Sequence, residues 1–283
     1  MDQPSVTIVG PGSLGSAIAV ALSAAGYSIR EVVAGKSRAS RQRARRLARK
    51  VRGRWTALRN AHLHADVVWL SVPDRAIATV AAELARRTDW KGKTVLHSSG
   101  ALSSDELSAF RRRGAAVASL HPLMTFVGGS QPSLAGVPFA VEGDAAAIRV
   151  ARRLVRDLKG KTFKIAKKNK PAYHAWGAFT SPLLLAALVT AEEVAELAGI
   201  ARATARKRML PIVRQTIANY GALGPAGAFS GPIIRGDADI VSRHLKALRQ
   251  SSGARDVYLA LARAALRNLP VQNRRALNRI LGS

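Results

Sequence analysis

Two hydrophobic patterns follow one another along the chain. In the first half, short runs of β-branched and aliphatic residues alternate with segments whose apolar residues recur every three or four positions. The runs predict buried strands, and the segments between them predict amphipathic helices. Beyond Lys168 only the helical spacing continues. The pattern therefore predicts an α/β protein, with a doubly wound Rossmann-type sheet over residues 1–166 and an all-helical domain over residues 167–283.

The expected elements follow from these patterns and from the residues that interrupt them. Strands are predicted at 6–9, 27–33, 65–72, 94–97, 115–120, 137–141 and 162–165. Helices are predicted after the first strand and at 40–51, 77–84, 104–112 and 145–158, then at 171–197, 204–220, 238–248, 254–266 and 271–281. Pro182 falls inside the first helix of the second domain and is expected to kink or divide it.

The first predicted strand leads directly into a glycine-rich turn and a helix. Gly10 permits a sharp turn off the strand, Gly12 leaves room for a pyrophosphate, and Gly15 lets the helix pack closely on the strand. Free N–H groups at the helix N-terminus would then hold the phosphates. This stretch predicts a dinucleotide-binding unit, and a strand, turn and helix without a ligand is the alternative. The residues expected to contact the dinucleotide are Gly10, Gly12, Ser13, Leu14 and Gly15.

The second predicted strand decides between the two nicotinamide dinucleotides. Its acidic residue, Glu31, is followed by two valines, so it lies inside the strand and not at the tip, where an acid would bind the ribose hydroxyls. The tip is followed instead by Lys36, Ser37 and Arg38, whose cations and hydroxyl suit the 2′-phosphate of NADP. We therefore expect NADP as the cofactor. The further residues expected to contact it are Val72 and Pro73.

Candidate catalytic groups lie where strands end and where the helical half begins. Ligands of a parallel sheet bind outside the carboxyl ends of its strands, and there the sequence places His97–Gly100 and His121. Lys170 and His174 are four residues apart, so they share one face of a helix. We expect His121 or His174 to be the acid–base group, and Lys170 to anchor a substrate carboxylate or serve as an alternative acid. The predicted catalytic residues are Ser98, Ser99, His121, Lys170 and His174, with capping or packing roles as the alternative.

Composition narrows the set of partners. The chain has no cysteine, no HExxH motif and no close carboxylate pair aimed at a site, so we expect neither a disulfide framework nor a metal site. Its 45 Lys and Arg against 17 Asp and Glu give a net charge of +28, which attracts anionic cofactors and carboxylate substrates. No aromatic residues interleave with the densest basic segment, 36–54, so we interpret it as a solvated helix face and do not expect nucleic acid as a partner.

Two further features bear on location and assembly. Residues 1–5 are too few and too polar to form a secretory signal. The most apolar stretch, 172–191, contains Ser181 and Pro182, so we expect a buried helix, no membrane span and a cytoplasmic location. The helix predicted at 171–197 has more apolar surface than its neighbours can cover, which predicts a homodimer built on the helical domain.

Several motifs together resemble those of a known family. They are the GxGxxG turn, Val72-Pro73-Asp74, His97-Ser98-Ser99-Gly100, Leu120-His121-Pro122, Lys170 with Tyr173-His174, and Ser230 to Asp237 followed by His244-Leu245. With these motifs the chain resembles proteins that combine a Rossmann-like domain with a DUF2520 domain. That family is similar in architecture to pyrroline-5-carboxylate reductase, prephenate dehydrogenase and the 6-phosphogluconate dehydrogenase superfamily. The resemblance implies an NADP-dependent oxidoreductase with its active site between the domains and a dimer formed through the helical domain.

The resemblance also implies roles for single residues. Ser98-Ser99 and His121 match loops near the hydride-transfer site of prephenate dehydrogenases, and Lys170 matches the catalytic lysine of β-hydroxyacid dehydrogenases. At Ser181 the chain departs from the family pattern, in which asparagine is usual. We therefore expect an NADP(H)-dependent oxidoreductase acting on a small anionic substrate, with a non-catalytic dinucleotide-binding sensor or scaffold as the alternative. A nucleic-acid-associated protein is a third hypothesis, which rests on charge alone.

Overall fold

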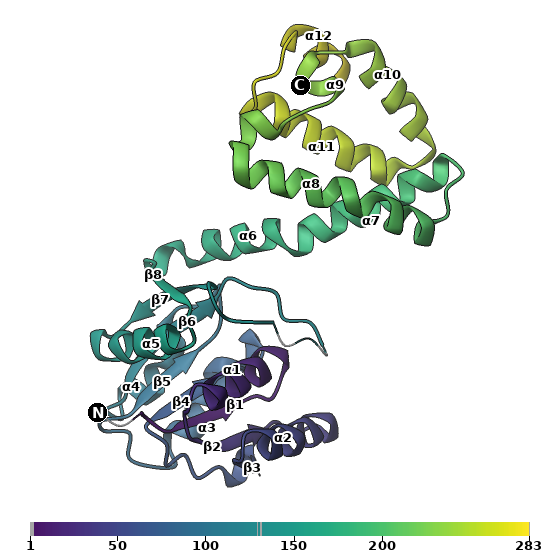
Figure 1. Cartoon of the computed structure of the whole chain (residues 1–283). Helices are drawn as coiled ribbons and strands as arrows, with labels where there is room; N and C mark the ends of the chain where they lie inside the picture. Colours follow the sequence, from purple (N-terminus) through teal and green to yellow (C-terminus); the bar gives the residue numbers. More distant parts are fainter. Residues whose placement is uncertain (1–2, 129, 131, 283) are drawn as a thin grey trace. The chain divides into compact units, whose positions relative to one another are not determined.

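An eight-stranded sheet forms from the first half of the chain (Figure 1). The computed structural model describes residues 3–128, 130 and 132–282. The strands are β1 Val6–Val9, β2 Ile29–Ala34, β3 Arg54–Ala57, β4 Val67–Leu70, β5 Thr94–His97, β6 Ala116–Pro122, β7 Pro138–Gly143 and β8 Lys161–Lys164. Their spatial order is β3-β2-β1-β4-β5-β6-β7-β8, and every neighbouring pair is parallel except β6 and β7. The mainly parallel sheet confirms the predicted fold class.

Helices cover both faces of this sheet. One face carries α1 Ser13–Ala24, α2 Arg38–Lys50 and α5 Ala145–Asp157, and the other carries α3 Asp74–Ala85, the 3₁₀ turn η2 Ser104–Leu107 and α4 Ser108–Arg111. The period-two alternation of strand side chains explains the two cores: Ile8 of β1 packs toward α1, α2 and α5, whereas Val9 packs toward α3 and α4. This arrangement places the carboxyl ends of β1, β2, β4, β5 and β6 at one edge of the sheet.

The edge strand β3 is the one strand that the sequence did not predict. It carries no apolar run, and Thr56 is its buried residue. It forms because its backbone pairs with β2 and because Thr56 Oγ1 donates a hydrogen bond to Glu31 Oε1 over 2.7 Å. Glu31 itself is buried inside β2 and also accepts from the backbone N–H groups of His62 and Leu63. The sequence-based placement of Glu31 inside the strand is therefore confirmed.

The chain divides into two compact units, Met1–Ala178 and Phe179–Ser283. The sequence placed the boundary near residue 166, whereas most of helix α6, Lys170–Thr180, belongs to the first unit. This difference arises because Lys170 and Tyr173 of α6 are buried among residues of the sheet and its loops. The short turns of this unit are η1 Leu58–Asn60 and η3 Lys167–Asn169.

The second unit contains helices and turns, and no strand, among its described residues. Its elements are α7 Pro182–Leu197, α8 Arg202–Ala228, α9 Pro232–Arg235, α10 Ala238–Ala247, η4 Leu248–Gln250, α11 Ser252–Asn268 and α12 Arg274–Leu281. The predicted break at Pro182 is confirmed, since α6 ends at Thr180 and α7 begins at Pro182. A small core of Val241, Leu266 and Leu277 joins α10, α11 and α12.

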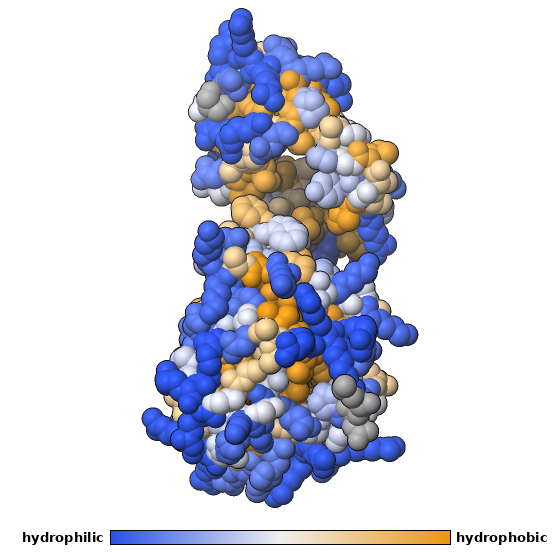
Figure 2. Space-filling view, turned by 90° about the vertical axis from the view of Figure 1, so that its left-hand side faces the viewer, coloured by the Kyte–Doolittle hydropathy of each residue, from blue (hydrophilic) through white to orange (hydrophobic). Residues whose placement is uncertain are grey.

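Helix α7 is not the buried helix that the sequence predicted. Within α7 the one buried residue is Glu192, and Leu183, Leu185 and Val189 are exposed. The 167–197 stretch is long and apolar enough to cross a membrane by length and composition alone, and 6% of its most apolar window is buried. Figure 2 shows apolar surface of this kind among the charged side chains of the molecule. The prediction failed because apolar spacing predicts a face that needs cover, and this unit does not supply it.

Candidate active site

The glycine turn at the end of β1 has the geometry that a dinucleotide needs. Gly10 has a φ of +101°, in the left-handed region that favours glycine, and a Cβ there would lie 2.6 Å from Ser71 O. A Cβ on Gly15 would lie 2.1 Å from Gly10 O, so the helix approaches the turn as closely as backbone allows. Gly12 differs from both, because a Cβ there would meet nothing within 4 Å. The space beside Gly12 is open.

The N-terminus of α1 is free to hold an anion. Gly12 occupies its N-cap position, and no side chain caps the helix. The first-turn N–H groups, together with the positive end of the helix dipole, favour a phosphate at this place. Nearby, the Ser71 hydroxyl is buried without a hydrogen-bond partner among the described residues. An open cradle, an uncapped helix and an unpaired hydroxyl fit the pyrophosphate of a dinucleotide.

The loop after β2 presents the cations that the sequence singled out. Lys36 and Arg38 are exposed, and neither makes an ion pair with another described residue. The Ser37 hydroxyl caps α2 by accepting from Ser40 N over 3.1 Å. At the end of β4, Val72 lies beside the glycine turn, with Cγ1 3.1 Å from the position of a Gly10 Cβ, and Pro73 precedes α3. The predicted cofactor contacts thus lie in the loops that follow β1, β2 and β4, at the carboxyl-terminal edge of the sheet.

The loop after β5 is held from within by His97. Ser99 N donates to Nδ1 of this buried imidazole over 3.1 Å, so the other ring nitrogen carries the proton. That Nε2–H donates to Ser103 O over 3.0 Å. Burial lowers the pKa of His97 to about 4, consistent with a neutral ring whose two nitrogens are both engaged. His97 therefore shapes the loop and presents no free nitrogen to a ligand.

The two predicted catalytic serines are also bonded within the protein. Ser98 Oγ accepts from Trp69 Nε1 over 2.7 Å. Ser99 Oγ donates to Asp74 Oδ2 over 2.8 Å and accepts from the backbone N–H of Leu102 over 2.9 Å. These contacts close the loop into a fixed turn. They bring Asp74, at the start of α3, into the site, a residue that the sequence interpretation had not assigned a role.

Lys170 lies beneath this loop. Its side chain is 1% exposed, and Nζ donates to Ser99 O over 2.9 Å and to Ser119 Oγ over 2.7 Å. Burial lowers the pKa of the Lys170 ammonium to about 8, and the nearby Glu142 and Asp74 carboxylates partly oppose that change. The contacts join the β5 loop to β6 through α6.

His121, at the end of β6, meets α6 above the same loop. Its Nδ1 lies 2.7 Å from the Tyr173 hydroxyl, and its ring centroid lies 6.3 Å from that of His174. A Cβ on Gly100 would lie 2.9 Å from His121 Nε2 and 2.7 Å from His174 Cδ2, so any side chain there would displace one of the two imidazoles. The two histidines and the β5 loop therefore converge on Gly100.

Burial sets the protonation of the His121 and Tyr173 pair. It lowers the pKa of His121 to about 4, aided by the Lys170 charge, and raises the pKa of Tyr173 to about 12. At neutral pH the imidazole is therefore neutral and the phenol keeps its proton. When the phenol donates to Nδ1, the imidazole proton lies on Nε2, the nitrogen that faces Gly100. The pair can present one N–H donor to a ligand atom.

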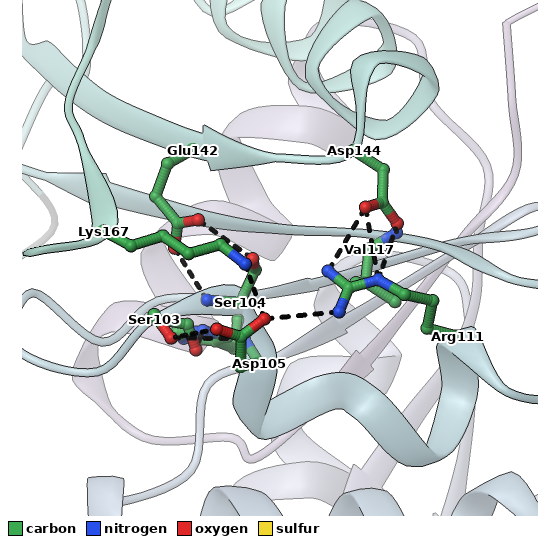
Figure 3. A network of polar contacts seen from close by, with 9 residues as sticks. Ser103, Ser104, Asp105, Arg111, Val117, Glu142, Asp144 and Lys167 are labelled. Carbon is green, nitrogen blue, oxygen red and sulfur yellow. Dashed lines mark hydrogen bonds and ion pairs between the residues drawn. The ribbon is translucent and has the colours of Figure 1, made fainter.

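Figure 3 shows a network of carboxylates that fixes the next part of the loop. Buried Glu142 of β7 accepts from Ser104 N over 2.6 Å and from Ser104 Oγ over 2.9 Å. Asp105 accepts from Lys167, just before α6, and from Arg111. Together with the bond from Lys170 to Ser99 O, these contacts anchor the segment from Ser98 to Leu107 to β7 and to the residues at the start of α6.

Two family models match this chain, and together they cover most of it. Residues 2–122 match the Rossmann-like domain, and residues 137–265 match the domain of unknown function DUF2520. The chain therefore carries a Rossmann-like domain followed by a DUF2520 domain. The candidate site uses both domains, since Ser99 and His121 fall in the Rossmann-like match, whereas Lys170, Tyr173 and His174 fall in the DUF2520 match. No curated protein sequence matches the chain.

Solved structures with this fold extend over nearly the whole chain. A Bacteroides fragilis protein described as an NADP oxidoreductase by inference is 21% identical to this chain. The match covers 93% of this chain and 97% of that protein, with a TM-score of 0.78. A Thermotoga maritima protein is 25% identical, covering 97% and 98%, with a TM-score of 0.72. A reductive aminase from Aspergillus terreus, solved with NADPH and ethyl-5-oxohexanoate, is 16% identical, covering 98% and 99%, with a TM-score of 0.67. The fold of this chain is thus shared by proteins of several names.

Acid-sensitive stability is expected from buried His97 and half-buried His121. Since the pKa of both His97 and His121 falls from the ordinary 6.5 to about 4, the unfolded chain binds more protons than the folded chain between these values. The stabilisation is complete above pH 6.5 and is lost as the pH falls through that window, by up to about 3 kcal/mol for each histidine. In urea titrations, His97→Gln should show a shallower acid loss of unfolding free energy than wild type, and an equal slope would contradict this explanation.

Proposed function

We propose that this protein is an NADP(H)-dependent oxidoreductase that transfers a hydride to or from a small anionic substrate. The observation that carries the proposal is the placement, at one edge of one sheet, of the open glycine turn after β1 and of His121 Nε2 after β6. Support comes from the fold, which is shared with an NADPH-bound reductive aminase. A bound nicotinamide would supply the hydride, and the chain would supply position and electrostatics.

Two side chains of the site would have different roles in such a reaction. Neutral His121, held by Tyr173, donates through Nε2–H to the carbonyl oxygen or imine nitrogen and stabilises the charge that develops there. His174 is exposed beside it and can exchange a proton with water. The sequence left the acid–base role open between these two histidines, and the burial of His121 favours His174 for proton exchange.

Lys170 is better suited to positioning than to anchoring a carboxylate. Its ammonium is buried and donates to Ser99 O and Ser119 Oγ, so a substrate would have to displace these bonds to reach it. Held there, the ammonium adds to the effect of burial in lowering the pKa of His121, and its bond to Ser99 O helps to fix the turn that carries Gly100. We propose Ser98 and Ser99 as part of the same support, because their hydroxyls bond Trp69 and Asp74.

Selectivity for NADPH over NADH is expected from the loop after β2. Replacing both Lys36 and Arg38 by alanine removes two cations that would face the 2′-phosphate, which NADH lacks. NADPH affinity should fall about tenfold or more, and NADH affinity should stay near its starting value, in fluorescence titrations. The matched control replaces Arg43 and Arg46, two other cations of α2, by alanine. It makes the same change in net charge. Equal affinities for both cofactors in the wild-type protein would overturn the choice of NADP.

The reaction itself is tested by a metabolite screen that follows nicotinamide absorbance with the purified chain. Carboxylate-bearing ketones and imines with NADPH, and the matching alcohols and amines with NADP⁺, are the first compounds to include. A change in absorbance that depends on both protein and compound supports the enzyme. Saturable NADPH binding with no turnover across the screen would favour the non-catalytic sensor or scaffold.

We infer that the second unit forms a homodimer. Apolar side chains on α7 and α8, among them Leu185, Val189, Ile212 and Ile217, are exposed, and an apolar groove of about 490 Å³ lies between α7, α10 and α11. Surfaces of this kind are covered in stable proteins, and obligate dimer interfaces resemble cores. Light scattering should give twice the mass of one 30.1 kDa chain, and Leu185→Glu with Val189→Glu should give the monomer. A monomeric wild-type protein at micromolar concentration would contradict the dimer.

A further inference from the structure

A continuous basic surface lies at the β3 edge of the sheet, away from His121 and Lys170. Between residues 36 and 64 the chain has 11 Lys and Arg and no Asp or Glu. The structure gathers exposed members of this segment from α2, from β3 and from the residues that follow. We call this surface the basic edge, defined by Arg41, Arg45, Arg49, Arg54, Arg59 and His62. Figure 1 shows α2 and β3 together at this end of the sheet.

The basic edge is hollowed and not flat. One hollow of about 620 Å³ lies between Arg45 and Arg49 of α2 and Arg54 and Trp55 of β3. A second, of about 290 Å³, is lined by Arg41, Arg54 and residues up to His62. Cations on both walls of a groove concentrate a positive potential inside it. The surface is therefore shaped to receive an elongated anion.

The arginines of the basic edge form no ion pair with another described residue. Arginines four residues apart on one helix repel each other, which disfavours the folded state until an anion neutralises them. The Arg45 guanidinium lies 4.5 Å from the Trp55 ring centroid, which fixes it above the groove. This contact reduces the side-chain freedom that Arg45 would lose on binding.

The dimensions favour a polymer over a metabolite. Arg41, Arg45 and Arg49 follow one another at about 6 Å along a helix that is about 20 Å long. A nucleic-acid duplex carries one charge for about every 1.7 Å of its axis, so it meets all of these cations at once. Trp55 is the only Phe, Tyr or Trp between residues 36 and 64, and Arg45 covers its face, so stacking of unpaired bases is not offered.

We propose that the basic edge binds the phosphate backbone of a nucleic-acid duplex without reading its sequence. The proposal departs from the expectation drawn from the sequence, which interpreted segment 36–54 as a solvated helix face. The structure changes that interpretation because Arg54, Arg59 and His62 join the helix to form a two-walled groove. The proposal goes beyond the oxidoreductase function and does not depend on it, since Arg45, Arg49 and Arg54 lie outside the predicted NADP contacts.

The test is a salt series of duplex binding with the full chain. A short labelled DNA duplex of arbitrary sequence is titrated, and anisotropy gives the affinity at each salt concentration. One variant combines Arg45→Gln, Arg49→Gln and Arg54→Gln, which keep much of each side chain's packing. The matched control combines Arg267→Gln, Arg275→Gln and Arg279→Gln, three exposed arginines of the second unit that make the same change in net charge.

The first variant should bind about tenfold or more weakly, and its slope of log affinity against log salt should be smaller by about three. The control should stay within about twofold of wild type. Equal weakening by both variants would show that net charge alone drives binding and would overturn the proposal. Absence of duplex binding by the wild-type chain, or tighter binding to vesicles of anionic lipid than to the duplex, would overturn it as well. Thermal unfolding of each variant establishes that it is folded.

Discussion

A valine in place of Gly12 is expected to abolish NADPH binding and to leave the first unit folded. Gly12 has a φ of −73°, which any residue adopts, and a Cβ there would meet nothing within 4 Å. The backbone and the Cβ of the added side chain are therefore accommodated without strain. The side chain would instead fill the open space above the N-terminus of α1, where the pyrophosphate is expected. NADPH affinity should fall about a hundredfold or more, which corresponds to at least about 2.7 kcal/mol.

The matched control for this variant is Gly15→Val, three residues further along the same turn. Its Cβ would lie 2.1 Å from Gly10 O, so α1 could not pack on the turn and the unit should lose stability. Fluorescence titration with NADPH and thermal unfolding separate the two effects. Gly12→Val should lose binding and keep its unfolding temperature, whereas Gly15→Val should lose both. A folded Gly12→Val protein that binds NADPH like wild type would show that the turn has only a structural role.

The sequence predicted those elements that bury apolar side chains on a regular period. β1, β4 and β5 are short apolar runs, and the amphipathic spacing of α2 and α5 is equally regular. β3 escaped prediction because it forms by backbone pairing with β2 and by the Thr56 contact with Glu31, neither of which leaves a periodic apolar pattern. The sequence predicted a surplus of apolar surface on the 171–197 helix, and α7 exposes that surplus, but the spacing of apolar residues could not predict which element covers it.

Topology predicted where the candidate site residues lie, but not their contacts. Strand ends had to bring His121 and the β5 loop to one edge, because β5 and β6 are parallel neighbours. The burial of Lys170 and its bond to Ser119 could not be predicted, because they depend on how α6 packs on the sheet. Tyr173 was visible in the motif beside His174, yet its contact with His121 is made only by the folded chain.

The largest effect on turnover is expected from His121→Ala. The side chain presents Nε2 at Gly100, is neutral at pH 7 because burial lowers its pKa to about 4, and is oriented by the Tyr173 hydroxyl at 2.7 Å. A fixed N–H donor aimed at a developing negative charge is worth about 100-fold to 1,000-fold in kcat. Removing it should cost that factor with the substrate found by the screen. NADPH affinity should stay within about twofold, because His121 lies outside the predicted cofactor contacts.

Tyr173→Phe distinguishes this explanation from a merely structural role for His121. Phenylalanine keeps the ring contacts with His121 and Phe163 and removes only the hydroxyl that fixes the imidazole. If His121 acts through an Nε2–H that Tyr173 orients, the loss of the hydroxyl should weaken this effect. In Tyr173→Phe, kcat should then fall about tenfold while KM changes little. In the double variant the two losses should not add, because Tyr173 acts through His121. If the losses in kcat of the two variants add fully, or if His121→Ala keeps kcat within about threefold of wild type, His121 has no part in the reaction. The proposal that the chain binds NADPH would not be affected by either result.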